Sequence, residues 1–362
     1  VKLTLKIKLL PTDKQSKLLI QTLNEANSAC NSISEIAWQE KIFNNFKLHH
    51  QCYHGFKASM NLSSQMLVRC IAKVADSYKL DKKAKRSFKP LGSIAYDSRI
   101  MTYKPDNVVS LWCIGGRQKI AFVCHNKKYI PYIKGEANLV LKNDKFYLFQ
   151  TVDVPEDDVK DVEEFIGVDF GLTTIAHTSN NVEFSADGLN KYREYRQKVR
   201  SSLQRKGTKG AKRLLKRLSG KERTHSNIVN HTISKKIVQS AKSQNKGIAI
   251  EDLKGIRFTS KRRNKKFRTK LGKWNFYDLR KKLEYKALLN GVRLMVVPAP
   301  YTSKTCSCCK HIGKRTNKRF ECANCGTKID ADFNASINIA SLGLSINKPE
   351  ESNMFCSIVN HF

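Results

Sequence analysis

The sequence predicts an α/β protein of roughly two or three domains, and three observations lead to that prediction. The chain has 362 residues, 40% of them hydrophobic, which is enough to bury more than one core and excludes a wholly disordered chain. In the first half a long helical pattern precedes short runs of β type, whereas strands and helices alternate in the second half. An acidic stretch at residues 155–164 separates the halves, and we interpret it as a domain boundary.

The first half begins with a strand and continues with helices. Residues 1–9 alternate aliphatic residues with Lys and Thr, which is typical of a half-buried strand. Pro11 ends this strand, and Thr12 with Gln15 fits a capping box at a helix start. A mostly helical pattern then extends to about residue 84. We expect the short β-type runs that follow to form a β-barrel or sandwich that can include the N-terminal strand: residues 108–112, 119–124, 137–141 and 146–154.

The second half has the element order of a mixed sheet covered by helices. A buried strand at 165–168 ends at Asp169, and residues 173–178 supply a returning strand. One long helical stretch is expected over residues 190–244, followed by a buried strand that ends at Glu251. The remaining elements are a helix at 276–290, a strand at 292–297, a cysteine module and a last helix from Asp332. This order is compatible with a ribonuclease H-like mixed sheet.

The charge of the chain indicates a polyanionic partner. Lys and Arg number 67 against 31 Asp and Glu, which leaves a formal charge of +36. A compact chain with that excess repels itself unless phosphates neutralise it, so nucleic acid is the first candidate partner and a small-metabolite enzyme acting alone is disfavoured. No segment approaches the roughly 20 apolar residues of a membrane span, so we expect a cytoplasmic protein without a membrane partner.

Three acidic residues stand at the boundaries of predicted buried elements: Asp169, Glu251 and Asp332. Carboxylates that converge at strand ends repel one another unless divalent cations lie between them, and Mg²⁺ prefers oxygen ligands. Two such ions about 4 Å apart can activate water and stabilise the leaving oxygen of a phosphodiester. Any single acid of this kind can instead be a turn residue or helix cap. We expect Asp252 to be a cap, whereas Asp330 could exchange roles with Asp332.

Four cysteines form two pairs at the spacing of a zinc site: Cys306, Cys309, Cys322 and Cys325. Two CxxC pairs separated by twelve residues suit a tetrahedral Zn²⁺, although the gap is shorter than the common ribbon range of about 15 to 20. A site with four thiolates has no open position, so we expect a structural ion. Cys308 is interpreted as a free thiol. Five basic residues between the pairs would give the module a phosphate-facing surface: Lys310, Lys314, Arg315, Lys318 and Arg319.

Two basic runs are candidate nucleic-acid contacts. Residues 191–223 contain fourteen Lys and Arg against two Glu, and residues 254–273 contain ten with no acid. Phe258, Phe267 and Trp274 accompany the second run and offer surfaces for stacking single-stranded bases. A solvated face is the simpler reading of any charge run. The candidates are Lys261, Arg262, Arg263, Lys265, Lys266 and Arg268 in the second run, and Arg205, Lys212, Arg213, Lys216 and Arg217 in the first.

Several of these motifs together resemble the TnpB family of transposon-encoded proteins, which are related to type V CRISPR effectors. The resemblance rests on five segments: GVDFGL at 167–172, IAIEDLKG at 248–255, YTSKTCSCC at 301–309, ECANCG at 321–326 and DADFNASINIA at 330–340. It implies a RuvC-like nuclease with an inserted zinc ribbon, a helical recognition domain and a wedge β-barrel. By motif alignment, Asp169, Glu251 and Asp332 would be the metal-binding triad, and the four cysteines would bind zinc.

The resemblance also implies domain boundaries, cofactors and partners. Residues 1–11 and 86–160 would form the wedge barrel, 12–85 the recognition domain, 161–300 with 327–346 the nuclease domain, 301–326 the ribbon and 347–362 a flexible tail. Two catalytic Mg²⁺ ions, replaceable by Mn²⁺, one structural Zn²⁺ and a guide RNA would be the cofactors. A monomer would use guide RNA from the transposon end to cut double-stranded DNA next to a short adjacent motif. A nuclease-dead RNA-guided regulator and a strand-transferring DNA transposase remain as alternatives.

Overall fold

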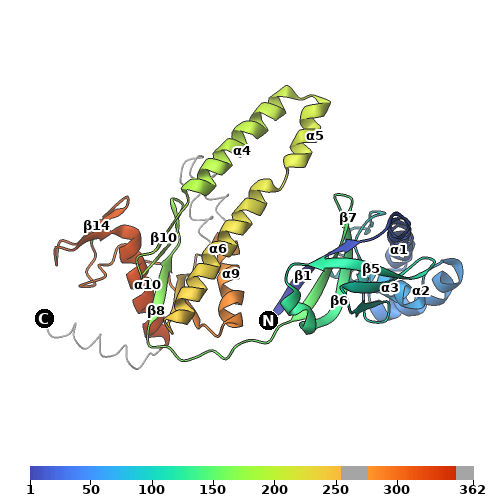
Figure 1. Cartoon of the computed structure of the whole chain (residues 1–362), viewed down its shortest axis with the longest axis horizontal. Coiled ribbons are helices and arrows are strands. Elements are labelled where there is room, and N and C mark those ends of the chain that lie inside the picture. Colours follow the sequence, from blue (N-terminus) through green and yellow to red (C-terminus); the bar gives the residue numbers. More distant parts are fainter. Residues whose placement is uncertain (254–275, 348–362) are drawn as a thin grey trace. The chain divides into compact units, whose positions relative to one another are not determined.

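The computed structural model describes residues 1–253 and 276–347, and the chain divides into two compact units, Val1–Val154 and Pro155–Phe362 (Figure 1). The division falls at the start of the acidic stretch 155–164. The basic run at 254–273 and nearly all of the expected tail lie outside the described residues. Among the described helices, none combines the length and apolar character that crossing a membrane requires.

The first unit contains three helices where the sequence predicts helical structure: α1 (Asp13–Gln39), α2 (Asn45–Ser59) and α3 (Ser64–Leu80). The capping box at the start of α1 is confirmed, because the Gln15 amide donates to Thr12 Oγ1 at 3.3 Å and the Thr12 amide donates to Gln15 Oε1 at 3.1 Å. Asn44 and Ser63 cap α2 and α3 in the same way, with side-chain oxygens that accept from backbone amides.

The same unit contains one seven-stranded antiparallel sheet in the order β2-β6-β7-β1-β5-β4-β3. The predicted N-terminal strand, β1 (Lys2–Leu10), lies at its centre and buries Leu5, Ile7 and Leu9. Tyr103 Oη on β3 hydrogen-bonds Gln150 on β7, so the sheet curls over its own core. The other strands are β2 (Ile94–Tyr96), β3 (Met101–Lys104), β4 (Val108–Cys113), β5 (Gly116–Cys124), β6 (Ile133–Lys142) and β7 (Lys145–Asp153), with a short 3-10 helix, η1 (Lys127–Tyr132), before β6.

The second unit is built on the mixed sheet that the sequence predicts. Its order is β10-β9-β8-β11-β12, with β8, β11 and β12 parallel and β9 and β10 antiparallel to their neighbours. The strands are β8 (Phe165–Asp169), β9 (Thr174–Thr178), β10 (Glu183–Ser185), β11 (Gly247–Glu251) and β12 (Leu294–Val297). Every residue of β9 and β11 is buried, which explains the apolar run Ile248–Ile250 of β11.

Helices cover the two faces of this sheet. Ile166 and Val168 of β8 pack with α6 (Lys221–Ser243) and α9 (Phe276–Leu289) on one face. Phe165 points to the other face, where α10 (Ala331–Asn347) lies across β8. Gly167 permits this approach, because a Cβ there would lie 1.9 Å from the Ser336 carbonyl oxygen of α10. The alternation of side chains along β8 therefore assigns odd-numbered residues to the face that meets α10.

The single helical stretch expected over residues 190–244 is wrong in one respect, because it forms three helices. They are α4 (Asp187–Lys206), α5 (Lys209–Leu218) and α6, with α5 joining the far ends of α4 and α6 (Figure 1). Gly207 at φ 64° and Gly220 at φ 79° adopt left-handed conformations that end one helix and precede the next. A small three-stranded antiparallel sheet completes the unit: β13 (Lys314–Thr316), β14 (Arg319–Glu321) and β15 (Lys328–Asp330).

Candidate active site and metal centre

Three carboxylates from distant parts of the sequence meet at the carboxyl end of the mixed sheet. Asp169 is the last residue of β8 and Glu251 the last residue of the neighbouring parallel strand β11. Asp332 is the second residue of α10, which packs on the same face of β8. Glu251 and Asp332 are each only 7% exposed. The fold thus places the three acids that the sequence singles out in one electrostatic group.

The electrostatics of this group show that negative charge exceeds positive charge. Burial, followed by repulsion from Glu251 and Asp332, raises the pKa of Asp169 from 3.8 to about 8. Burial also raises the pKa of Glu251, although Thr302 Oγ1 donates a hydrogen bond to its carboxylate and opposes the shift. Sites that hold carboxylates in this state favour added cations, because a cation stabilises the ionised form that burial penalises.

One arginine contacts the group. The Arg315 guanidinium on β13 donates to Asp332 Oδ1 at 2.7 Å and lowers the pKa of both Asp169 and Glu251. Sequence analysis included Arg315 among phosphate-facing residues but did not predict this contact, and it did not predict the role of Thr302. Thr302 precedes the first cysteine pair and Arg315 lies between the two pairs, and both reach the acids only through tertiary contacts, so no local sequence pattern predicts their partners.

The two neighbouring acids whose roles were open have other partners. Asp330 is exposed, and its Oδ1 accepts from the backbone amides of Asp332 and Phe333 at 2.9 Å each, so it caps α10. The Asp252 carboxylate forms an ion pair with Arg280 of α9 at 2.9 Å, and its expected role as a cap stays a prediction. Neither residue has the buried environment of Asp169, Glu251 and Asp332.

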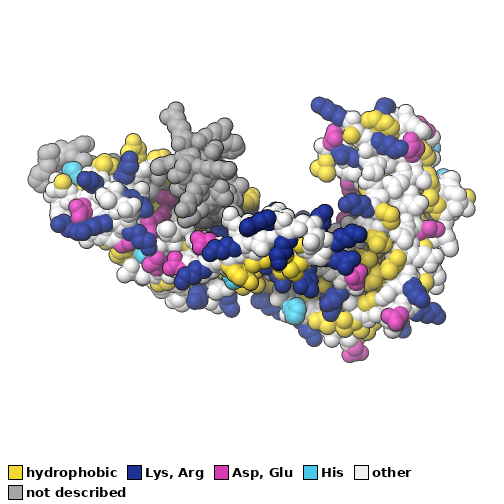
Figure 2. Space-filling view, turned by 90° about the horizontal axis from the view of Figure 1, so that it is seen from above, with side chains coloured by type: hydrophobic (Ala, Val, Ile, Leu, Met, Phe, Trp, Pro, Cys, Tyr) yellow, Lys and Arg dark blue, Asp and Glu magenta, His cyan; other side chains and the backbone are white. Residues whose placement is uncertain are grey.

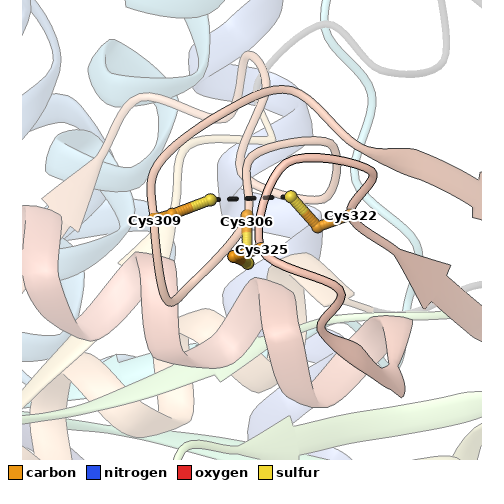
Figure 3. A group of neighbouring side chains, drawn as sticks. All are labelled: Cys306, Cys309, Cys322 and Cys325. Carbon is orange, nitrogen blue, oxygen red and sulfur yellow. Dashed lines mark hydrogen bonds between the residues drawn. The ribbon is translucent and has the colours of Figure 1, made fainter.

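The four predicted zinc ligands form a compact cluster (Figure 3). Their sulfur atoms all lie within 4.8 Å of one another, with 3.6 Å between Cys306 and Cys325 and 3.5 Å between Cys309 and Cys322. Tetrahedral Zn–S bonds of about 2.3 Å would put the sulfurs roughly 3.8 Å apart, so the donor set fits zinc. The His311 backbone amide lowers the pKa of Cys309 to about 5, whereas the pKa of its partner Cys322 is raised to about 11; a bound metal would favour the thiolate form of both. Cys308 is exposed and lies outside the cluster.

The carboxylate group is more open than the cysteine cluster. Within residues 1–253 and 276–347, the cysteines are the one set of three or more potential ligands whose ligand atoms all lie within 4.8 Å of one another. Mg²⁺ retains several waters and binds through one or two carboxylates, so it does not need such close convergence. Carboxylates at two strand ends and at the start of α10 are a donor set of the kind that hard divalent cations prefer.

The basic candidates divide between described and undescribed residues. Arg205 lies in the last turn of α4, and four more candidates lie on α5; all five are exposed: Arg205, Lys212, Arg213, Lys216 and Arg217. Many Lys and Arg side chains are visible on the face shown in Figure 2. The candidates of the second run, Lys261, Arg262, Arg263, Lys265, Lys266 and Arg268, lie outside the described residues.

Comparison with known proteins supports the resemblance. A family model described as "Cas12f1-like, TNB domain" matches residues 276–339, which include α9, β12 and the cysteine cluster. The CRISPR-associated endodeoxyribonuclease Cas12f1 of Sulfoacidibacillus thermotolerans is 30% identical over 220 residues, covering 55% of this chain and 50% of that protein. TnpB-like protein MJ0751 of Methanocaldococcus jannaschii is 33% identical over 145 residues, covering 40% of this chain and 52% of that protein. The chain is thus similar to TnpB-like proteins and to Cas12f1 endodeoxyribonucleases.

The chain spans about half the length of each of these two relatives. A solved structure adds information on fold. The cryo-EM structure of a Cas12f1–sgRNA–target DNA complex matches with a TM-score of 0.59 and 17% identity, over 91% of this chain and 83% of that chain. At that identity the likeness concerns the fold alone.

Proposed function

We propose that this chain is an RNA-guided DNA endonuclease that cuts target DNA beside a short adjacent motif, by two-metal hydrolysis in a RuvC-like site. The observation that carries the proposal is the buried group of Asp169, Glu251 and Asp332 at the carboxyl end of the mixed sheet. Relatives named as endodeoxyribonucleases and as TnpB-like proteins support it, as does a structural neighbour that holds a guide RNA and target DNA.

The residues of the site have distinct roles in this proposal. Asp169, Glu251 and Asp332 would hold two Mg²⁺ ions, which supply Lewis acidity for the attacking water and the leaving oxygen when bound; Mn²⁺ would substitute. Thr302 fixes the orientation of Glu251 through its hydroxyl donor. The Arg315 guanidinium donates a hydrogen bond to Asp332 from the cysteine module. In this proposal it would also donate to a phosphate of the substrate strand. Asp169 must lose the proton that its raised pKa favours before it can bind a cation.

We assign the remaining parts by their shape and charge. The curled sheet, residues 1–11 with 86–160, would be the wedge, and the helices within 12–85 the recognition domain. Residues 161–300 with 327–346 would be the nuclease domain, and 301–326 a ribbon held by one structural Zn²⁺. The division at Val154 and Pro155 and the separate sheets of the two units support this arrangement.

Guide RNA would be the main polyanion that balances the formal charge of +36. We propose that it derives from the transposon end and that one copy of the chain binds one RNA in the prokaryotic cytoplasm. Base pairing then reads the target, so the protein needs only to hold the backbone of the heteroduplex. The exposed cations of α5 are suited to that task, because phosphate contacts require charge and carry no sequence information.

The test is to purify the full chain from cells that carry its transposon, sequence the RNA that copurifies, and assay DNA cleavage with Mg²⁺. The proposal expects a defined structured RNA and cleavage beside sequences complementary to its end. RNA with DNA binding but no cleavage would favour the nuclease-dead regulator. Strand joining in the absence of RNA would favour the transposase. A matched variant, Asp169→Asn, should retain the RNA and lose cleavage.

The RNA-binding role of α5 has its own test. Replacing Lys212, Arg213, Lys216 and Arg217 by Gln should make the affinity for the RNA less sensitive to salt, because each duplex phosphate contact contributes about −0.9 to the slope of log affinity against log salt. Titrations at several salt concentrations measure this slope. An unchanged slope would show that these residues form only a solvated face.

A further inference from the structure

A histidine lies in the same row of the sheet as Asp169. In the antiparallel pairing of β8 with β9, Asp169 lies directly opposite His177, and in the pairing of β9 with β10, His177 lies opposite Glu183. Directly opposed residues of antiparallel strands point to the same face, with Cα atoms about 5 Å apart. That face is the one covered by α10, because Asp169 and Gly167 alternate on it. His177 is therefore a neighbour of the carboxylate group.

His177 is buried without the hydrogen bond that a structural histidine needs. The residue is 5% exposed, and its Nδ1 has no hydrogen-bond partner within the part of the chain that the structure describes. Its ring centroid lies 5.6 Å from that of Phe333, which follows Asp332 on α10. An unsatisfied buried donor or acceptor costs about 1 to 3 kcal/mol, so a purely packing role would be better served by an apolar or β-branched residue.

The other acid in the row does not explain the histidine. Glu183 Oε1 already accepts from Thr174 Oγ1 at 2.7 Å and from Lys318 Nζ at 2.9 Å. Lys318 also reaches Thr174 at 3.1 Å, so this carboxylate is held between the sheet and the ribbon. His177 helps to lower the pKa of Glu183, but its Nδ1 forms no hydrogen bond to that carboxylate in the described residues and remains unpaired in the row that also contains Asp169.

We propose that His177 supplies an imidazole nitrogen to the metal ion held by Asp169, and that this ligand makes the site prefer Mn²⁺ to Mg²⁺. The inference rests on the proposed function, since it requires that the carboxylates bind a divalent metal. Imidazole is a good ligand for first-row transition ions, whereas Mg²⁺ prefers an all-oxygen shell. The orphaned buried nitrogen and the neighbouring carboxylates together form a mixed donor set of that kind.

The test measures metal coordination and does not depend on activity. The full chain, with its RNA, is labelled with ¹⁵N-histidine and loaded with Mn²⁺, and electron spin echo modulation detects histidine nitrogen bound to the ion. The labelled nucleus separates histidine from RNA bases, whose nitrogens remain ¹⁴N. We expect ¹⁵N coupling in the unsubstituted protein and its loss in His177→Asn. His231→Asn, on α6 and hydrogen-bonded to Tyr285, is the matched control and should keep the coupling.

Competition between Mn²⁺ and Mg²⁺ gives the second readout. His177→Asn should lower the preference for Mn²⁺ by about tenfold or more, as loss of groups at metal sites commonly does. His177→Thr, which suits a strand, guards against a folding defect in the first variant, and zinc content reports an intact ribbon. Mn²⁺ binding that is lost in Asp169→Asn but shows no ¹⁵N coupling would overturn this inference alone. Mn²⁺ binding that Asp169→Asn leaves unchanged would instead overturn the proposed carboxylate site.

Discussion

The two ends of the five-stranded sheet both carry acidic residues, but the acids differ in their burial and in the positive charge that surrounds them. At the amino end, two exposed acids of the 155–164 stretch each pair with a cation: Asp157 with Lys242 at 3.0 Å, and Asp161 with Arg293 at 3.5 Å. Those carboxylates are 57% and 98% exposed. At the carboxyl end, three buried or nearly buried acids share the one arginine that contacts them in the described residues, Arg315.

The comparison shows how function can be recognised from charge balance. Exposed ion pairs contribute about 0 to 1 kcal/mol, so the amino end is ordinary surface electrostatics. Burying carboxylates without equal positive charge is destabilising, and natural proteins tolerate it mainly where a ligand or reaction requires it. The carboxyl end therefore has the character of a binding site, while the amino end fixes the acidic stretch to the sheet.

The largest effect should follow from removing an acid at the carboxyl end. Asp169→Ala, Glu251→Ala or Asp332→Ala each removes a metal ligand and should reduce DNA cleavage by roughly a thousandfold or more, while binding of RNA remains. Cleavage assays and filter binding on the same preparations measure both. Asp157→Asn, at the amino end, should cleave normally. Asp330→Ala should be mild, and an inactive Asp330→Ala beside an active Asp332→Ala would reverse our ligand assignment.

The second effect concerns the ribbon that brings Arg315 to the site. Zinc should be present at one ion per chain and should persist when Mg²⁺ is removed. Cys306→Ser with Cys322→Ser should abolish zinc binding, and with it stabilisation of about 10 kcal/mol or more, so the ribbon should unfold and cleavage should fall. Metal analysis by mass spectrometry and proteolysis of the ribbon measure these outcomes. Cys308→Ser is the control; full zinc in the double variant would refute the site.

The third effect is a pH dependence that only the carboxyl end should show. Between pH 4 and 8, folded Asp169 holds a proton that the unfolded chain has released, because its pKa is about 8 instead of 3.8. The folded state then binds more protons, so the free energy of unfolding should fall as pH rises, by up to about 1.4 kcal/mol per unit. Denaturant titrations in Mg²⁺-free buffer test this. Asp169→Asn should flatten the slope, whereas a slope that survives in this variant would assign it to another group.

The smallest effect is expected from the exposed pairs. Lys242→Ala breaks the pair with Asp157 and should change the free energy of unfolding by less than about 1 kcal/mol. Arg315→Ala leaves Asp332 and its neighbours without their cation and should raise the pKa of Asp169 further. Chemical denaturation of the two variants at several pH values measures both effects and allows a direct comparison of Lys242→Ala with Arg315→Ala. Equal effects from both substitutions would remove the distinction between the two ends of the sheet.

The sequence predicts the elements whose pattern is local. The alternation before Pro11 predicts β1, the apolar runs before Asp169 and Glu251 predict two buried strands that end in acids, and the cysteine spacing predicts the cluster. Features that depend on tertiary contact are not predicted. The approach of Arg315 to Asp332 requires the folded ribbon, and the position of His177 requires the register of β8 with β9. The helix boundaries at Gly207 and Gly220 depend on left-handed glycine conformations, which the helical pattern of this basic segment does not predict.

The central claim is tested most directly by changing the guide and mapping the cuts. The purified protein is supplied with its RNA, or with the same RNA carrying a new targeting segment, and the DNA ends produced with Mg²⁺ are sequenced. We predict that the cut sites move with the new segment, remain beside the same short adjacent motif, and disappear with Asp169→Ala. Cleavage at one fixed sequence by protein free of RNA, or cut sites that ignore the new segment, would contradict the account.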